Sequence, residues 1–357
     1  MDSTRDCAYP TYLDTAAYGL PSTQVRDLAL EVTREWARGS VVWLRDWEPL
    51  ADDCRRLAAG LLGLGVEGIS LVPTVSVASA YVAWSLPRGA VVLAADNEFR
   101  SVLYPFMARE RRGEITLRLL PRQALETYAE HVDLLAVSHV ESADGHVNDV
   151  QGLTATAHGL GGRIYVDATH AVGTLPPVYA GVDHLAVTAY KWLCSPRGVS
   201  FLYTAPHVRP EMVPLATGWR SSPGYHDGAY FGGPLDLFED GRGLDVSVAW
   251  QPIVVARGCL QEIHAIPPQE RFERGHRVVG AVAEGLGLAA PAGTILSVPV
   301  TDPAATTEAL KRHGVKTGVQ GPARRVRLSA HFYNTHADVE PAVAALRALV
   351  DRRRTPA

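Results

Sequence analysis

The sequence lacks the features that mark several large classes of protein. No uninterrupted apolar run approaches the roughly 20 residues that a membrane helix needs. Basic residues are not in excess, because 34 Lys and Arg stand against 38 Asp and Glu, so neither nucleic acid nor an anionic membrane is an expected partner. Cysteine is scarce, and the four present form no CxxC or Cys/His pairing for zinc or a disulfide framework: Cys7, Cys54, Cys194 and Cys259. We expect reduced, mostly structural thiols and a small-molecule partner.

The composition indicates a globular protein with a sizeable core. The chain has 357 residues, of which 47% are hydrophobic, enough for one large or two ordinary domains. Its first ten residues, "MDSTRDCAYP", have neither the basic region nor the apolar region of a secretory signal. We therefore expect a soluble, cytoplasmic protein.

Short apolar runs alternate with helix-length segments over the first two thirds of the chain. The runs are "GISLVP", "AVVLAAD", "ITLRLLP", "VDLLAVSHV", "GRIYVDAT", "DHLAVTA" and "VSFLYT". Strands this apolar on both faces are typical of a mainly parallel sheet that is covered on both sides. The pattern predicts an α/β domain.

The segments around this sheet suggest how the chain is organised. Residues 21–62 have helical periodicity broken near Gly39, so we expect two helices there. Residues 218–243 are rich in Gly, Pro and aromatic residues, a composition that is common in loops lining a site. A long helix follows, and then a smaller unit of strands and helices. We expect an arm at 1–20 that contributes to the site, a large domain at 21–250 and a small α+β domain at 251–357.

Two patterns in the sequence suggest binding sites that their context does not support. "GLGVEG", residues 63–68, fits the dinucleotide-binding pattern G-x-G-x-x-G, but it follows a helix and precedes a strand, which is the reverse of the required order. The histidines lack the spacing of metal ligands and are expected to be surface or core residues: His131, His139, His146, His158 and His170.

A carboxylate and an amine end two neighbouring strands of the expected sheet. Asp167 ends "GRIYVDAT", and Lys191 follows the next strand, 24 residues later, between Tyr190 and Trp192. In a parallel sheet both side chains reach the same edge, where open α/β folds bind ligands. Pyridoxal phosphate (PLP) needs an acid at its pyridine nitrogen and an amine for a Schiff base. Alternatively, Asp167 caps the turn and Lys191 extends to solvent; spacing alone leaves both interpretations open.

The sequence resembles the class V aminotransferase-like PLP enzymes, which include cysteine desulfurases, kynureninase, isopenicillin-N-epimerase-like proteins and a group of carbon–sulfur lyases. The resemblance extends from "YLDTAAYGLPS" to "RLSAHFYNTHADVEPAVAAL". It implies the PLP-dependent transferase fold type I, with a mainly parallel seven-stranded sheet, a smaller C-terminal domain, and a homodimer with shared active sites. "VDATHAVG" implies that Asp167 pairs with the pyridinium and that His170 lies near the phenolic oxygen. "TAYKWL" gives Lys191 the Schiff base and makes Thr188 and Tyr190 phosphate contacts.

Other motifs imply further contacts. The loop "VPTVSVASA" places Thr74, Val75 and Ser76 at the cofactor phosphate, where a helix N-terminus favours an anion, although an ordinary N-cap has the same pattern. "DNEFRSVLYPF" places the Phe99 ring on the pyridine. "VRLSAHFYNT" makes Arg327 the fork for a substrate carboxylate. The arm residues Ala17 and Tyr18 are expected to contact the substrate.

The departures from the family bear on the reaction. Ser142 in "HVESADG" stands where many relatives have an asparagine, and Ser247 in "FEDGRGLDVSVAW" stands for the usual threonine that reaches the phosphate of the neighbouring subunit. The latter segment resembles the carbon–sulfur lyases of ergothioneine and lincosamide pathways. "GVKTGVQGPARRV" has no cysteine, which a desulfurase needs there.

We therefore expect β-elimination from a cysteine S-conjugate, releasing a thiol, pyruvate and ammonia, in secondary metabolism. The alternatives are an aminotransferase, an epimerase, a decarboxylating or oxidative PLP enzyme, and a non-catalytic protein that kept the fold.

Overall fold

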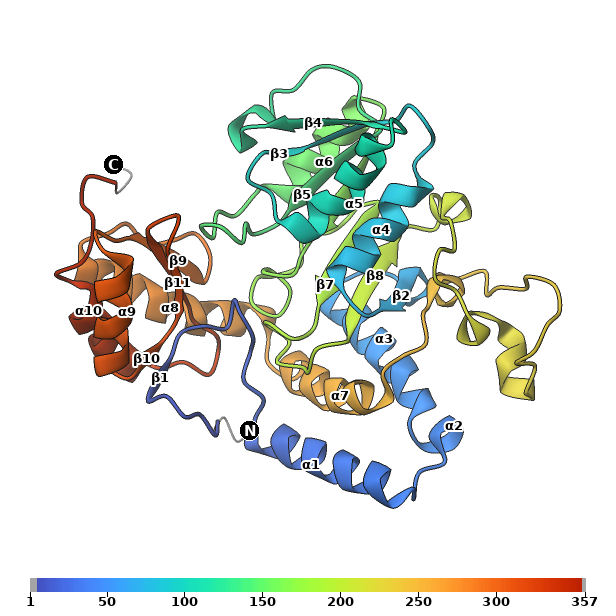
Figure 1. Cartoon of the computed structure of the whole chain (residues 1–357), viewed down its shortest axis with the longest axis horizontal. Helices are drawn as coiled ribbons and strands as arrows, with labels where there is room; N and C mark the ends of the chain where they lie inside the picture. The colour runs from blue at the N-terminus through green and yellow to red at the C-terminus, as the bar shows by residue number, and fades with distance from the viewer. Residues whose placement is uncertain (1–4, 355–357) are drawn as a thin grey trace.

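The computed structural model describes residues 5–354, which form a large α/β unit, a smaller unit and an N-terminal arm between them (Figure 1). Residues 1–4 of the expected arm and 355–357 of the expected small domain lie outside the described residues.

A seven-stranded sheet is the centre of the large unit. Its order is β2-β8-β7-β6-β5-β3-β4, and every neighbouring pair is parallel except the two that involve β8. Each apolar run of the sequence supplies one strand: β2 (Ile69–Val72), β3 (Val91–Ala95), β4 (Thr116–Leu120), β5 (Leu134–Ser138), β6 (Arg163–Asp167), β7 (His184–Thr188) and β8 (Ser200–Thr204). The predicted mainly parallel sheet is confirmed.

Helices cover both faces of this sheet. They are α3 (Glu48–Leu62), α4 (Val75–Ser85), α5 (Arg100–Arg111), α6 (Val150–Gly159) and α7 (Trp250–His264). Side chains that alternate along β5 enter two different cores: Leu134 and Ala136 pack with α4 and α5, whereas Leu135 and Val137 pack with α3, α6 and α7. Since both faces are buried except at the edge strand β4, the other strands are mostly apolar rather than alternating.

The N-terminal helices begin and end where local signals place them. The Ser22 side chain accepts from the Val25 N–H and caps α1 (Thr23–Arg38), and Gly39, at φ 64°, ends it in a left-handed conformation that favours glycine. The expected break is confirmed, with a short α2 (Trp43–Asp46) before α3. The remaining short turns are 3-10 helices: η1 (Val66–Gly68), η2 (Arg122–Ala124), η3 (Arg209–Glu211), η4 (Trp219–Ser221), η5 (Pro223–Asp227), η6 (Gly241–Leu244) and η7 (His336–Asp338).

The smaller unit has its own core. It contains the antiparallel sheet β11-β12-β9 and the helices packed on it: β9 (Ile295–Pro299), β11 (Gly318–Gln320), β12 (Arg325–Ser329), α8 (Pro268–Leu286), α9 (Pro303–Arg312) and α10 (Val339–Leu346). The side chains of α7, by contrast, belong to the core of the large unit. The domain division stays a proposal, and this packing moves its boundary from residue 250 to the connection between α7 and α8.

The N-terminal arm joins the two units. Its strand β1 (Thr11–Tyr12) pairs in parallel with β10 (Val315–Lys316) of the small unit. The Gly19 N–H then donates to the Tyr190 carbonyl at 3.0 Å in the large unit. A Cβ at Gly19 would collide with the Lys191 carbonyl oxygen, so the arm needs a glycine to pass this close.

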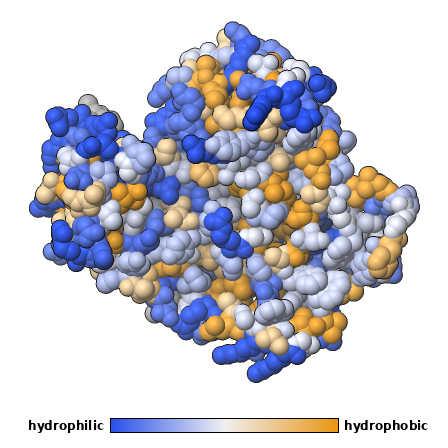
Figure 2. All heavy atoms as spheres, in the orientation of Figure 1, coloured by the Kyte–Doolittle hydropathy of each residue, from blue (hydrophilic) through white to orange (hydrophobic). Residues whose placement is uncertain are grey.

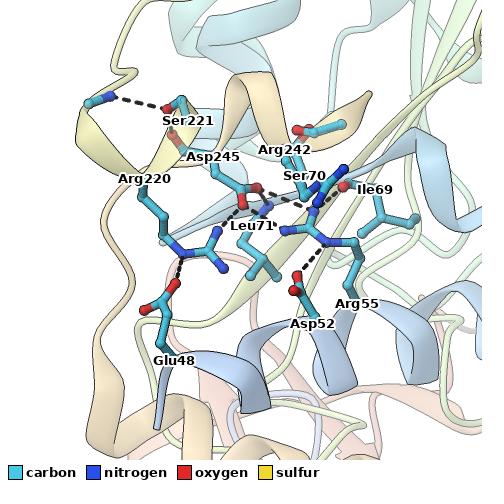
Figure 3. Close-up of polar contacts among 12 residues, drawn as sticks. Glu48, Asp52, Arg55, Ile69, Ser70, Leu71, Arg220, Ser221, Arg242 and Asp245 are labelled. Atoms are coloured by element: carbon cyan, nitrogen blue, oxygen red, sulfur yellow. Dashed lines mark hydrogen bonds and ion pairs between the residues drawn. The ribbon is translucent and has the colours of Figure 1, made fainter. Parts of the chain in front are cut away.

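A buried network of charges fixes the glycine-rich segment to β2 and α3 (Figure 3). Asp245 is fully buried and accepts from Arg55 Nη2 at 2.6 Å, from the Leu71 N–H at 2.7 Å and from Arg220. Arg220 also contacts Glu48. Each buried charge therefore has an opposite charge beside it, which offsets the cost of removing it from water. Because β2 leads directly into α4, the network also supports the N-terminus of that helix.

No helix among residues 5–354 is long and apolar enough to cross a membrane. In the same range no cluster of three or more His, Cys, Asp or Glu side chains has the arrangement of a metal site.

Candidate active site

A pocket opens at the carboxyl edge of the large sheet. Its lining comes from the ends of β5, β6 and β7, the N-termini of α4 and α5, and the loop before β8: Thr74, Val75, Ser76, Phe99, Ser101, Ser138, Ser142, Asp167, Thr169, His170, Thr188, Tyr190, Lys191 and Arg197. Parallel strands bring their carboxyl ends together here, as expected for ligand binding by this class of sheet.

Lys191 is buried in this pocket and forms a hydrogen bond with His170. Its Nζ lies 3.0 Å from His170 Nε2, and the Phe99 and Tyr190 rings lie 5.5 and 5.9 Å from the same nitrogen. Burial lowers the pKa of Lys191 from 10.5 to about 8, although Asp167 opposes the shift. A lysine with such a pKa is unprotonated in about a tenth of molecules at pH 7, far more than an ordinary lysine, and in that form it can act as a nucleophile or base.

Asp167 is the buried carboxylate of the site. Its Oδ1 accepts from the Thr169 N–H at 2.9 Å. Burial raises the pKa of Asp167, while the hydrogen bonds from Thr169 and the nearby Lys191 lower it. A buried carboxylate is costly unless a cation or strong donor joins it, so the side chain suits a protonated ring nitrogen.

The N-terminus of α4 and two hydroxyl groups form the opposite side of the pocket. Thr74 caps α4 by accepting from the Val77 N–H at 3.3 Å, and Val75 and Ser76 begin the helix. Thr188 Oγ1 accepts from Ser200 Oγ at 3.0 Å, which leaves the hydrogen of Thr188 free to donate into the pocket. These donors at a helix N-terminus fit a phosphate.

Arg327 reaches the site from β12 of the small unit. Its Nη1 donates to the Ser142 carbonyl at 2.7 Å and to Ser142 Oγ at 2.9 Å. Its Nε is buried without a hydrogen-bond partner among the described residues. Burial lowers the pKa of Arg327 although Asp14 opposes it. An unsatisfied guanidinium N–H beside a pocket fits a carboxylate of a bound molecule.

Most of the predicted site residues line the pocket, and four do not: Ala17, Tyr18, Ser247 and Arg327. Arg327 contacts the lining residue Ser142, whereas Tyr18 and Ser247 are exposed. Tyr18 packs on Tyr12 instead, with ring centroids 5.7 Å apart. The arm still touches the site through its backbone, at Gly19.

Sequence reasoning missed four residues of the pocket: Ser101, Ser138, Thr169 and Arg197. Arg197 lies over the Tyr190 ring at 4.4 Å. Ser138 and Thr169 end or follow strands next to predicted site residues. Their position at strand ends was the available signal, since the carboxyl edge collects such side chains.

Glu98, also missed, lies behind the pocket. It accepts from the Ser138 N–H at 2.7 Å, from Ser138 Oγ at 2.6 Å and from the Phe99 N–H at 2.6 Å. Burial raises the pKa of Glu98 to about 7. These bonds hold the backbone from which the Phe99 ring projects.

Comparison with known proteins finds similar sequences and a family model that matches part of the chain. Residues 74–241 match the model of the family "Aminotransferase class-V". The uncharacterized aminotransferase YcbU of Bacillus subtilis (strain 168) is 29% identical over 309 residues, 81% of this chain and 81% of that protein. Isopenicillin N epimerase of Streptomyces clavuligerus is 28% identical over 345 residues, 86% of each chain.

Solved structures show the same fold. A cystine C–S lyase, C-DES, in complex with cysteine persulfide has a TM-score of 0.85 at 20% identity, covering 96% of this chain and 98% of that one. A further structure of C-DES carries glycine covalently linked to its PLP cofactor. The expected fold type I is confirmed. With a buried lysine and a buried aspartate at the carboxyl edge of the sheet, the chain is a PLP-dependent enzyme that is similar to the class V aminotransferases.

Proposed function

We propose that this enzyme cleaves the C–S bond of a cysteine S-conjugate by β-elimination: the conjugate and water give a thiol, pyruvate and ammonia. The observation that carries the proposal is a site with a basic lysine and a free guanidinium face but no reactive thiol. Two resemblances support it: that of residues 238–250 to lyases of ergothioneine and lincosamide pathways, and the fold shared with a cystine C–S lyase. We accordingly propose a role in secondary metabolism.

The residues present fit PLP. Asp167 would hold the pyridine nitrogen, Phe99 would stack on the ring, and His170 would face the phenolic oxygen. The phosphate would lie at the N-terminus of α4, within reach of five residues: Thr74, Val75, Ser76, Thr188 and Tyr190. When bound, the cofactor supplies an electron sink that makes the Cα proton of an amino acid acidic.

The protein's own groups orient the substrate and move its proton. Arg327 binds the α-carboxylate through its free Nε edge, while Ser142 holds the other side of the guanidinium. The Nζ of Lys191, in its unprotonated form, would take up the Cα proton of the bound amino acid. Carboxylate binding in turn fixes that proton relative to the amine.

The cysteines argue against sulfur transfer to the enzyme. Burial raises the pKa of Cys54 and of Cys194 to about 12 and that of Cys259 well above its ordinary value, so these three thiols stay protonated. The segment before Arg327 has no cysteine. Sulfur is therefore expected to leave as a free thiol, as in a lyase rather than a desulfurase.

The first experiment compares absorbance spectra of the wild type, Lys191→Ala and, as a matched control, Lys311→Ala, each supplied with PLP and then with S-substituted cysteines. We expect a borohydride-reducible band near the visible edge in the wild type and in Lys311→Ala, and its loss in Lys191→Ala. Pyruvate, ammonia and thiol should then form in equal amounts.

Other products would replace the proposal. Inversion at Cα without loss of sulfur would make the enzyme an epimerase, the second candidate, which the identity to isopenicillin N epimerase favours. An amino group transferred to a keto acid would indicate an aminotransferase, and carbon dioxide or peroxide would indicate a decarboxylating or oxidative enzyme. The absence of any band would leave a protein that kept only the fold.

We also propose that the enzyme is a cytoplasmic homodimer with shared sites. Residues 215–247 project from the body of the large unit (Figure 1), and Figure 2 shows apolar surface on this lobe. Phe231 and Leu235 in the lobe are 94% and 75% exposed. Ser247 is exposed and outside the pocket of its own chain, which agrees with a contact to the phosphate of the neighbouring subunit. Ala17 and Tyr18 are proposed to contact a bulky substituent of the substrate.

A further inference from the structure

The indole of Trp192 determines which nitrogen of His170 carries a proton. Trp192 is fully buried, and its Nε1–H donates to His170 Nδ1 at 3.1 Å. An indole nitrogen is a donor only, so Nδ1 must offer its lone pair. Burial holds the pKa of His170 well below its ordinary value, so the ring is neutral. A neutral imidazole that accepts at Nδ1 carries its hydrogen on Nε2.

That hydrogen points toward the amine of Lys191. The distance from His170 Nε2 to Lys191 Nζ is 3.0 Å, which is a hydrogen bond. An Nε2–H can donate only to an amine with a lone pair, which is the unprotonated form. If Lys191 were an ammonium group, its N–H would face the His170 Nε2–H, and two donors would meet with no acceptor. The chain Trp192–His170–Lys191 is therefore satisfied only when Lys191 is neutral.

We propose that Trp192 is a positioning residue that fixes His170 as the Nε2–H tautomer and thereby favours the neutral amine of Lys191, the form that would take up the cofactor aldehyde. The inference rests on the proposed role of Lys191 and adds a device that prepares it. Without the indole N–H, His170 could carry its hydrogen on Nδ1 and accept from an ammonium at Nε2.

The other groups around Lys191 do not determine this choice. Asp167 favours the ammonium, whereas Arg327 and Arg197 disfavour it, and Tyr190 contributes a ring face. The charges of Lys191 and Arg327 also lower the pKa of His170.

The indole is held in place from its other side by His331. This histidine donates through Nε2 to the Trp192 carbonyl at 2.7 Å, and its ring meets the indole edge at 5.2 Å. The indole therefore has one orientation toward His170.

The tautomer can be observed directly in the cofactor-free wild type. Long-range proton–nitrogen NMR distinguishes Nε2–H from Nδ1–H, and the His170 signals are those missing in His170→Gln. We expect Nε2–H with an unprotonated Nδ1. Finding Nδ1–H, or an imidazolium at neutral pH, would overturn the proposal without any need for a Trp192 variant.

The second experiment follows the pKa of Lys191 in cofactor-free protein labelled at lysine. The chain has only three lysines, so the exposed Lys311 and the partly exposed Lys316 serve as internal references. In Trp192→Phe, which keeps an aromatic ring but loses the donor, we expect the pKa of Lys191 to rise by about one unit, reducing the neutral fraction near pH 7 about tenfold.

The matched control is Trp250→Phe, which also loses a part-buried indole N–H, the one that donates to Glu48 at 2.9 Å far from Lys191. Its Lys191 titration should match the wild type. An unchanged Lys191 pKa in Trp192→Phe would refute the positioning role. Neither experiment depends on turnover. If the wild type forms pyruvate but the Lys191 pKa is unchanged in Trp192→Phe, only this inference is refuted. If that pKa rises but the wild type forms no pyruvate, only the proposed reaction is refuted.

Discussion

The buried amine of Lys191 makes the stability of the folded protein depend on pH. Its pKa is about 8 in the folded protein and 10.5 in an exposed chain, and the side chain is almost wholly buried. Between these values the unfolded state binds more protons, so this residue makes the folded state more stable as pH rises from 8 to 10.5. Below pH 8 the ammonium is present in both states and its full desolvation cost is felt.

Replacing the amine by an apolar chain should therefore stabilise the cofactor-free protein. At pH 7 we expect Lys191→Met to raise the free energy of unfolding by up to ~3 kcal/mol, an advantage that disappears as pH approaches 10.5. Urea unfolding of both proteins at several pH values measures the difference in their free energies of unfolding. The buried tyrosines are common to both proteins, so their contribution cancels in this difference. A gain that did not change with pH would show that Lys191 is not charged when buried.

The site residues differ in how far sequence could predict them. Asp167 ends β6 and Lys191 lies just beyond the end of the neighbouring β7, so the topology brings them together. Arg327 came from its motif. The bond from Trp192 to His170 has no such signal, since it depends on the rotation of one indole about its side-chain bonds. The role that the sequence suggested for His170, near the cofactor oxygen, gave no hint of its contact with Lys191.

At the scale of elements, Asp245 connects the glycine-rich segment to β2 and α3. It has two buried guanidinium partners, Arg55 and Arg220, and also holds the Leu71 N–H. Asp245→Asn removes the negative charge that the two cations share, which leaves Arg220 with Glu48 alone and Arg55 with the partly exposed Asp52. We expect a loss of ~3 kcal/mol or more in stability, measured by urea unfolding.

The same variant should bind PLP more weakly, because β2 leads into the N-terminus of α4. Asp240→Asn is the matched control: Asp240 pairs with Arg242 where both side chains are about one third exposed, so its loss should cost under about 1 kcal/mol. Equal effects of the two substitutions would contradict the role assigned to the buried network.

The elements differ in predictability for a physical reason. Except for the edge strand β4, the strands of the large sheet are buried on both faces, so continuous apolar runs identify them locally. The two-residue strands β1 and β10 exist only because segments about 300 residues apart pair. Likewise Arg55 and Asp245 are 190 residues apart, and the sequence around each residue does not indicate that they pair.

The whole molecule is expected to be complete only as a dimer. The lobe with Phe231 and Leu235 exposes large apolar side chains, which in water are unfavourable unless another surface covers them. A second copy is the proposed cover, because Ser247 at the end of this segment then reaches the partner's phosphate.

Sedimentation at micromolar concentration tests this arrangement. We expect the wild type to be a dimer and Phe231→Ser with Leu235→Ser to weaken it by ~3 kcal/mol or more, over a hundredfold in dissociation constant, since each side chain loses ~1.5–3 kcal/mol of burial. PLP affinity should fall in parallel, because the phosphate loses a contact from the other subunit. Leu119→Ser, on the edge strand β4, is the control and should leave both unchanged. A wild-type monomer with full cofactor occupancy would mean that the phosphate is held by Thr74, Ser76, Thr188 and Tyr190 of one chain alone.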